Sequence, residues 1–193
     1  MSHPYTWATS VPDLASERLL LRPLHDDDAP ALFEVFSDPE VMRYWSSGPH
    51  KTHEDTRALI HRIRDGFARH TVFQWCVARR GDDLAIGTVT LLRFDVDHKR
   101  CEVGYVIGRA HWGQGLAREA VSRLTDFAFD ELHLHRLEAD VDPRNVRSIA
   151  LLERLGWTRE GLLRERYHVH GEVQDTAFLG LLRREWKPPT PAR

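Results

Sequence analysis

Hydrophobic residues recur at helical spacing in two segments near the start of the chain. We expect the first helix from the acidic run at residues 26–28 to Phe36, because carboxylates favour helix N-termini. After a loop with aromatic residues, the second begins at Thr52, which forms a capping-box-like pattern with Asp55. The side chains expected on its buried face are Leu59, Ile60, Ile63 and Phe67.

Short runs rich in β-branched and aromatic residues predict strands along the rest of the chain. Pro23 should end the first strand or place it at a sheet edge. Two antiparallel hairpins are indicated, one around residues 81–83 and one around His170 and Gly171. The predicted strands are residues 18–24, 72–79, 84–94, 101–107, 135–141, 162–169 and 173–182.

A strand, a glycine turn and an amphipathic helix follow one another without a spacer between residues 101 and 132. Gly113 and Gly115 allow positive φ and remove the Cβ atoms that would keep an anion from the unpaired N–H groups of the first helical turn. An ordinary turn before a core helix fits the glycines equally well. With the strand at 135–141, the segment predicts a right-handed crossover between parallel strands.

Two common phosphate-binding motifs fit this turn poorly. The dinucleotide fingerprint needs a third glycine, and Arg118 stands in its place. The strands before the turn also read as an antiparallel meander rather than as further parallel units. A P-loop would require Gly-Lys followed by Ser or Thr, which is absent after the turn.

A further helix is predicted after the Asp142-Pro143 pair, with Asn145 as its N-cap and Gly156 as its C-cap. Its inner face is expected to carry Val146, Ile149, Leu152 and Leu155. Together the elements predict an α/β (α+β) fold. Its mixed, mostly antiparallel sheet of about seven strands contains one parallel βαβ unit and is flanked by about four helices.

Length and composition suit one globular domain over residues 1–193, since 41% of the residues are hydrophobic and 29% charged. The net charge of -2 gives no reason to expect a nucleic acid or a membrane as partner. No run approaches the roughly 18 to 20 apolar residues of a membrane span, and no signal-peptide pattern is seen, so we expect a cytoplasmic protein. The packed core is expected at 16–185, with frayed tails at 1–13 and 187–193.

Cysteines and histidines do not indicate a metal site. Cys76 and Cys101 lie in predicted strands, which favours buried reduced thiols over disulfides. The twelve histidines do not pair with them at ligand spacing. We therefore expect no metal cofactor.

Four motifs in order carry a family resemblance. They are SERLLLRPLHDDDAPALFEVFSDPEVMRYW at 16–45, GYVIGRAHWGQGLAREA at 104–120, DPRNVRSIALLERLGWTREG at 142–161 and LLRERYHVHGEVQD at 162–175. The chain thereby resembles the GNAT superfamily of acetyl-CoA-dependent N-acetyltransferases over residues 16–185. It is most similar to the RimJ/RimL branch, which acetylates the N-termini of ribosomal proteins.

The resemblance implies that acetyl-CoA binds at the glycine turn as co-substrate. The family pattern has Gln or Arg three positions before the first glycine, where this chain has Ala110. Because backbone N–H groups do most of the gripping, we treat this as a minor departure. The residues placed around the pyrophosphate are His111, Trp112, Gly113, Gln114, Gly115, Leu116 and Ala117.

In the family, the strands on either side of this helix splay apart to admit the pantetheine arm. Backbone of Tyr105, Val106 and Ile107 is then expected to contact the cofactor, with the N–H of Val106 as the candidate that polarises the thioester carbonyl. Ordinary sheet pairing is the alternative. The family N-x-x-S motif falls on Asn145 and Ser148, as a cofactor contact and a proton donor to the departing thiolate.

Catalytic acid and base are less defined. Asn145 and Ser148 would also suit a plain helix cap, and Leu152 stands where many GNAT enzymes place a tyrosine acid. Glu102 shares side-chain parity with Val106 and is the candidate base, although a carboxylate paired with arginine on the sheet surface is equally plausible.

Acceptor specificity is expected from the loop with Tyr44 and Trp45 and from the closing hairpin with Tyr167 and His168. Trp45 would also suit the core, and His168 would also suit solvent. A peptide N-terminal α-amine is the leading acceptor, a small-molecule amine such as an aminoglycoside or polyamine is the runner-up, and a non-catalytic acyl-CoA sensor is a third reading. The resemblance implies a monomer or a homodimer.

Overall fold

The computed structural model describes residues 10–169 and 171–189. These residues build one sheet with the strand order β1-β2-β3-β4-β5-β6-β8-β7. β5 and β6 run parallel and the other neighbouring strands run antiparallel. The strands are β1 Leu14–Ala15, β2 Leu19–Arg22, β3 Val72–Arg79, β4 Ala85–Asp95, β5 Arg100–Ile107, β6 Arg136–Val141, β7 Thr158–Val169 and β8 Glu172–Leu182.

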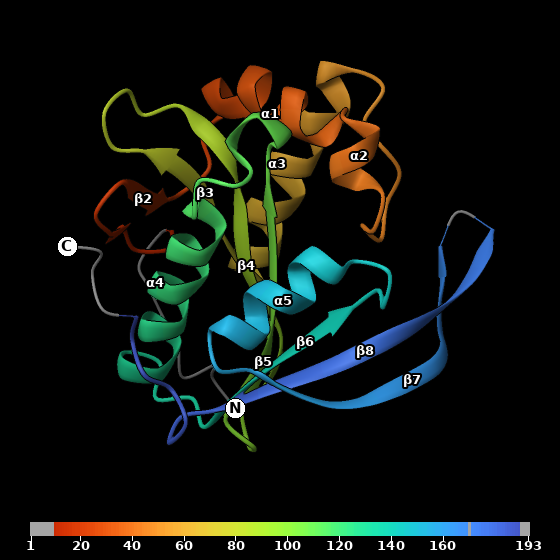
Figure 1. The fold of residues 1–193 in the computed structure, drawn as a ribbon. Helices are drawn as coiled ribbons and strands as arrows, with labels where there is room; N and C mark the ends of the chain where they lie inside the picture. The colour runs from red at the N-terminus through yellow and green to blue at the C-terminus, as the bar shows by residue number, and fades with distance from the viewer. Residues whose placement is uncertain (1–9, 170, 190–193) are drawn as a thin grey trace.

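Helices cover both faces of the sheet. In Figure 1, α4 and α5 lie in front of the strands and α3 lies behind them, while the β7–β8 hairpin projects past α5. We call the side of α4 and α5 the front face and the side of α1 and α3 the back face. The helices are α1 Ala29–Phe36, α2 Pro39–Met42, α3 His53–Ala68, α4 Leu116–Asp130 and α5 Val146–Arg154, with 3-10 turns at Asp26–Asp28 and Arg109–His111.

Two hydrophobic clusters hold the layers together. On the front face, Val121 and Leu124 of α4 and Leu152 of α5 pack with alternate residues of the central strands. On the back face, Ile60 of α3 and Val106 of β5 belong to the second cluster. Because successive strand residues point to opposite faces, these clusters fix which side of the sheet each β5 and β6 residue occupies.

The sheet divides between β5 and β6. Their pairing covers only Arg100 with Arg136, Cys101 with Leu137 and Glu102 with Glu138. Beyond these pairs, β5 continues along β4 to Ile107 and β6 continues along β8 to Val141. The predicted splayed βαβ unit is therefore confirmed, and the split begins at Val103.

Most predicted elements agree with the structure, including the Thr52–Asp55 capping box of α3. The first predicted strand ends at Arg22, directly before Pro23. The expected inner face of α5 is wrong at Val146, which is 67% exposed. At 100° per residue, Val146 and Leu155 lie on opposite sides of the helix, so only Ile149, Leu152 and Leu155 can share the buried face.

The packed part of the chain extends beyond the expected limits of 16–185. Val11 is buried in the front cluster, and the Pro12 carbonyl accepts a hydrogen bond from the Trp75 indole at 2.8 Å. Trp186 is also buried, and its indole donates to Asp126. Residues 1–9 and 190–193 of the expected tails lie outside the described residues, as does His170 of the closing turn.

No helix in the two described ranges is both long and apolar enough to cross a membrane.

Candidate active site

The glycine turn before α4 has the conformation that the sequence predicts. Gly113 and Gly115 have φ of 74° and 77°, in the left-handed region that side chains disfavour. Gly115 occupies the N-cap position of α4, so no side chain caps the helix. No atom lies within 4 Å of where a Cβ on Gly113 would stand. At the N-cap, a Cβ on Gly115 would lie 3.5 Å from the Arg18 guanidinium. The first turn of this 15-residue helix thus has uncapped N–H groups with open space at Gly113 and a cation beside Gly115, as suits an anion site.

Hydrogen bonds from both sides fix this turn in place. The Trp112 indole donates to the Ile107 carbonyl at 2.7 Å, which ties the turn to the end of β5. The Arg18 guanidinium donates to the Gln114 carbonyl at 2.9 Å and is itself held by Glu119 at 2.7 Å. These hydrogen bonds hold the turn in place without a ligand. The Ile107 carbonyl is already used, because it accepts the hydrogen bond from Trp112.

Two arginines that sequence reasoning did not single out lie at this turn. The Arg147 guanidinium lies 5.2 Å from the Trp112 ring centroid, and Arg18 reaches the backbone of Gln114. Burial lowers the pKa of His111, so its imidazole is neutral near pH 7. The positive charge around the turn therefore comes from the arginines and from the α4 dipole, which suits a pyrophosphate.

The split between β5 and β6 leads away from the turn. Segment Val103–Ile107 has no paired residue on β6, so its backbone on that side faces the gap. The Val106 side chain is buried in the back cluster, and its N–H and carbonyl point to β4, as the Gly108 N–H does in donating to the Ile86 carbonyl. The backbone groups that face the split are those of Val103, Tyr105 and Ile107. At Gly104, a Cβ would meet only Leu92 and Thr90, both at 3.9 Å, so the back of the split is open there.

The start of α5 closes the front of the split. The Asn145 side chain caps the helix by accepting from the Ser148 N–H at 3.2 Å. The Ser148 hydroxyl lies 2.7 Å from the Tyr105 hydroxyl, and burial raises the pKa of Tyr105 to about 12. The sequence predicted only a backbone role for Tyr105. Leu152, at the family tyrosine position, is fully buried in the front cluster.

A polar network crosses the split on the back face. The Arg93 guanidinium donates to Glu102 at 2.6 Å and to the Tyr167 hydroxyl at 3.0 Å. Tyr167 in turn donates to Oδ2 of Asp140. The chain from Glu102 on β5 to Asp140 on β6 thus spans the region where the two strands are not paired. Burial raises the pKa of Glu102 despite its arginine partner.

Sequence reasoning selected two members of this network, Glu102 and Tyr167, and missed Arg93 and Asp140. Asp140 alternates along β6 with Ala139 and Val141 of the front cluster, and this parity alone could place it on the back face. Tyr167 reaches it because β7 shifts register between Leu163 and Tyr167. No local signal in the sequence marks that shift.

The other predicted acceptor residues are more scattered. Tyr44 lies 6.0 Å from the Arg144 guanidinium, so the loop after α2 extends to the end of β6. His168 is exposed and pairs with Val173, on the other side of the hairpin from Tyr167. The structure therefore brings Tyr167 to Glu102 and leaves His168 apart from them.

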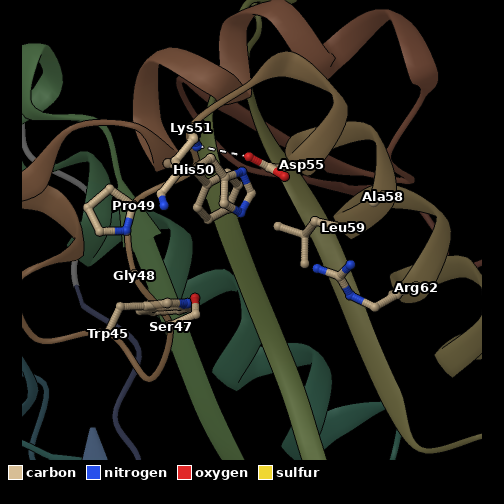
Figure 2. A pocket seen from close by; sticks show the side chains of 11 residues that line it. Trp45, Ser47, Gly48, Pro49, His50, Lys51, Asp55, Ala58, Leu59 and Arg62 are labelled. Carbon is tan, nitrogen blue, oxygen red and sulfur yellow. Dashed lines mark hydrogen bonds between the residues drawn. The ribbon is translucent and has the colours of Figure 1, made fainter. Parts of the chain in front are cut away.

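Trp45 packs against the back cluster and also lines a cavity of about 400 Å³. Figure 2 shows this cavity between the loop at residues 45–51 and α3, with Arg62 on the helix side. The Lys51 N–H donates to the Asp55 carboxylate at 2.9 Å, which holds the loop against the start of α3. Trp45 therefore packs as the core reading expects, and its role as an acceptor-binding residue stays a prediction.

Within residues 10–169 and 171–189, no group of three or more His, Cys, Asp or Glu side chains could hold a metal ion.

The sequence of this chain is similar to those of known acetyltransferases. Residues 18–158 match the family model of the acetyltransferase (GNAT) domain. The uncharacterized N-acetyltransferase p20 of Bacillus licheniformis is 38% identical, covering 90% of this chain and 97% of its own length.

Solved structures agree in fold. A proposed ribosomal-protein-serine acetyltransferase of Vibrio cholerae superposes with a TM-score of 0.81 at 28% identity, over 90% of this chain and 99% of the other. A spermidine N-acetyltransferase of Vibrio cholerae, in complex with CoA and spermine, gives 0.75 at 25% identity, over 87% and 97%. The uncapped helix, the open glycine turn and the split sheet fit the coenzyme that this family uses. The chain belongs to the GNAT family and is an acetyl-CoA-dependent N-acetyltransferase.

Proposed function

We propose that the acceptor is a primary amine in a molecule that carries no other positive charge, and that it is foremost a peptide N-terminal α-amine. The observation that carries this proposal is the charge layout on the back face of the split. Glu102 and Asp140 form its floor, with side chains 19% and 5% exposed. Arg93 and Arg166 stand at its rim, 54% and 46% exposed. The floor attracts an ammonium, and the rim repels an acceptor that carries several.

In this proposal the glycine turn binds the pyrophosphate and the split admits the thioester. Acetyl-CoA supplies a carbonyl activated by its thiol leaving group. Backbone N–H groups alternate in direction along β5, and the Gly108 N–H donates to the Ile86 carbonyl of β4, so the N–H of Val106, the candidate chosen from the sequence, also points to β4. The N–H groups of Tyr105 and Ile107 face the split and are then the candidates that stabilise the negative charge developing on the carbonyl oxygen. The hydroxyl of Ser148 donates a proton to the departing sulfur, and Tyr105 is placed to return one to Ser148 at 2.7 Å.

The protonation state of the acceptor supports an α-amine. Its pKa of about 7.7 to 8.0 leaves a useful neutral fraction at pH 7, whereas a lysine-like amine near 10.4 requires about 4 kcal/mol to deprotonate. On the back face, Arg93 engages Glu102 and Tyr167 engages one oxygen of Asp140, so the site offers no base strong enough for a lysine-like amine. A weakly basic amine matches such a site better.

A polyamine is the second candidate. It is supported by the relative that was solved with CoA and spermine. Arg93 and Arg166 at the rim argue against it, because they would repel the second cationic end of a polyamine.

The test is thiol release from acetyl-CoA with four acceptors: Ser- and Ala-initiated peptides, spermidine and an aminoglycoside. The expected result is the highest kcat/KM for a peptide. Preference for spermidine or the aminoglycoside would contradict the peptide proposal. Tight CoA binding without turnover of any amine would favour a sensor instead.

A further inference from the structure

Among the described residues, one oxygen of the Asp140 carboxylate accepts a hydrogen bond and the other accepts none. Its Oδ2 accepts from Tyr167 and lies 3.5 Å from Arg93 and 3.6 Å from Arg166. Its Oδ1 is buried and has no hydrogen-bond partner among the described residues. A buried acceptor atom without a donor is unfavourable, and the side chain is only 5% exposed. The protein thus holds an anionic oxygen ready for a donor that it does not itself provide.

The position of Asp140 relates this oxygen to the reaction. If the β5–β6 ladder continued past Glu102 and Glu138, the next back-face pair would be Gly104 and Asp140. The ladder stops there, so Asp140 stands across the split from the one β5 residue on that face without a side chain. Asp140 and Gly104 therefore flank the split on the back face. Because Oδ1 is buried, an acceptor reaches it only when the exposed side chains of Arg93 and Arg166 move aside.

We propose that Oδ1 of Asp140 binds the acceptor's ammonium group and takes a proton from it before attack on the thioester. This inference rests on the proposed acetyl transfer to a primary amine and adds the residue that seats the amine. Glu102 is thereby assigned to holding Arg93, and through it Tyr167, instead of to proton transfer.

The proton and bond changes balance. The ammonium gives one proton to Asp140, which later passes it to solvent. The neutral nitrogen forms the C–N bond and the C–S bond breaks. The nitrogen then loses its second proton to solvent as the amide forms. The sulfur leaves as a thiol protonated by Ser148, which regains a proton from solvent through Tyr105. The charged and titratable groups facing Asp140 are Arg93 of β4, Glu102 of β5, and Arg166 and Tyr167 of β7.

The test compares Asp140→Asn with Glu138→Gln. Glu138 lies two residues earlier on the same strand and face but in the paired part of the ladder, bound by Arg100 and Arg136. With an Ala-initiated peptide, Asp140→Asn should lower kcat/KM about 10²-fold near pH 6. The ratio of wild-type to variant kcat/KM should fall about tenfold per pH unit up to the amine pKa near 8. Without the carboxylate, only the fraction of amine that is already neutral can react. Glu138→Gln should match the wild type.

Two binding measurements complete the design. Affinity for CoA should be unchanged in Asp140→Asn, and binding of the peptide to the CoA-saturated protein should be weakened at least tenfold. Asp140→Ser, followed by its Tm, serves as a second variant if the asparagine variant folds poorly. A pH-independent deficit, or wild-type peptide binding, would overturn the proposal.

Failure of the proposed function would look different. If the wild type binds the peptide without turnover and Asp140→Asn does not bind it, ammonium binding at Asp140 is supported and acetyl transfer to the peptide is contradicted. If the wild type neither binds nor acetylates any amine in the panel, both proposals fall.

Discussion

The proposed donor and acceptor sides of this site are built by different means. The donor side, at the glycine turn and the starts of α4 and α5, uses backbone geometry, with Gly113 and Gly115 in the left-handed region. The acceptor side uses side chains from β4, β5, β6 and β7, joined by hydrogen bonds across the split. A site made of backbone depends on a few consecutive residues. A site made of side chains depends on the register of four strands.

The largest effect should come from a side chain in the glycine turn. Gly113→Val should lower CoA affinity by at least about 10²-fold, because the Cγ atoms would occupy the space before the α4 N–H groups. Calorimetric titration with CoA measures this directly.

Gly156→Val is the matched control for this variant. Gly156 also has a left-handed φ, 87°, and open space around it, but it follows α5 at the end away from the site. Both variants should lose similar stability, on the order of 1–2 kcal/mol, and only Gly113→Val should lose CoA binding. Equal affinity in the two would mean that the turn is an ordinary helix entry.

A smaller effect is expected where the two sides meet, at the pair Ser148 and Tyr105. Ser148→Ala should lower kcat about 10²-fold with little change in CoA affinity, because the thiolate loses its proton donor. Tyr105→Phe should lower kcat less, since the serine hydroxyl remains. Single-turnover rates with a peptide acceptor would separate this step from product release.

Ser122→Ala serves as the control for loss of a serine hydroxyl. Its hydroxyl donates to the Arg118 carbonyl within α4, at 2.7 Å and away from the split. Its kcat should equal that of the wild type. If Ser148→Ala behaved the same way, Ser148 would be only part of the Asn145 cap, and the acid would have to be sought elsewhere.

The same contrast explains what the sequence could predict. The turn at Gly113, the cap at Thr52 and the strand that stops before Pro23 depend on neighbouring residues, and all three agree with the structure. The strand β1, with two residues, and the helix α2, with four, carry too few residues for a periodic signal. Local pattern therefore predicted most of the fold and the conformation of the glycine turn, and the residues expected to hold the cofactor stay a prediction.

The acceptor side required information that no local pattern contains. Arg93 and Glu102 are nine residues apart, but Arg93 and Tyr167 are 74 apart and meet through sheet order and a register shift. The phenol of Tyr105 likewise meets Ser148 only because α5 packs over the split. Side-chain parity along β6 could have indicated Asp140, yet nothing in the sequence gave its partner.

The smallest expected effects come from two carboxyl groups, Glu102 and Glu119, whose pKa values are shifted in opposite directions. On the acceptor side, burial raises the pKa of Glu102. On the donor side, burial also pushes the pKa of Glu119 upward, but hydrogen bonds from the Arg18 N–H, Ser16 and the Arg18 guanidinium outweigh it and lower the pKa. A raised carboxyl pKa means that stability falls as pH rises through the interval from the unfolded to the folded value. A lowered pKa means that stability is lost as pH falls through that interval.

Glu102→Gln and Glu119→Gln should therefore change Tm in opposite directions at pH 7. Glu102→Gln removes a charge that is unfavourable in the fold, so its Tm should stay level or rise by about 1–3 °C, a gain of less than about 1 kcal/mol. Glu119→Gln removes a favourable one and should lower Tm by about 4–8 °C, or about 2 kcal/mol. As pH falls, Glu102 reaches its neutral form before Glu119 does, so the difference at Glu102 should narrow first. Thermal unfolding of both variants at pH 4 and pH 7 measures these shifts. A destabilised Glu102→Gln would show that the ion pair between Glu102 and Arg93 stabilises the fold by more than the burial of the Glu102 charge destabilises it.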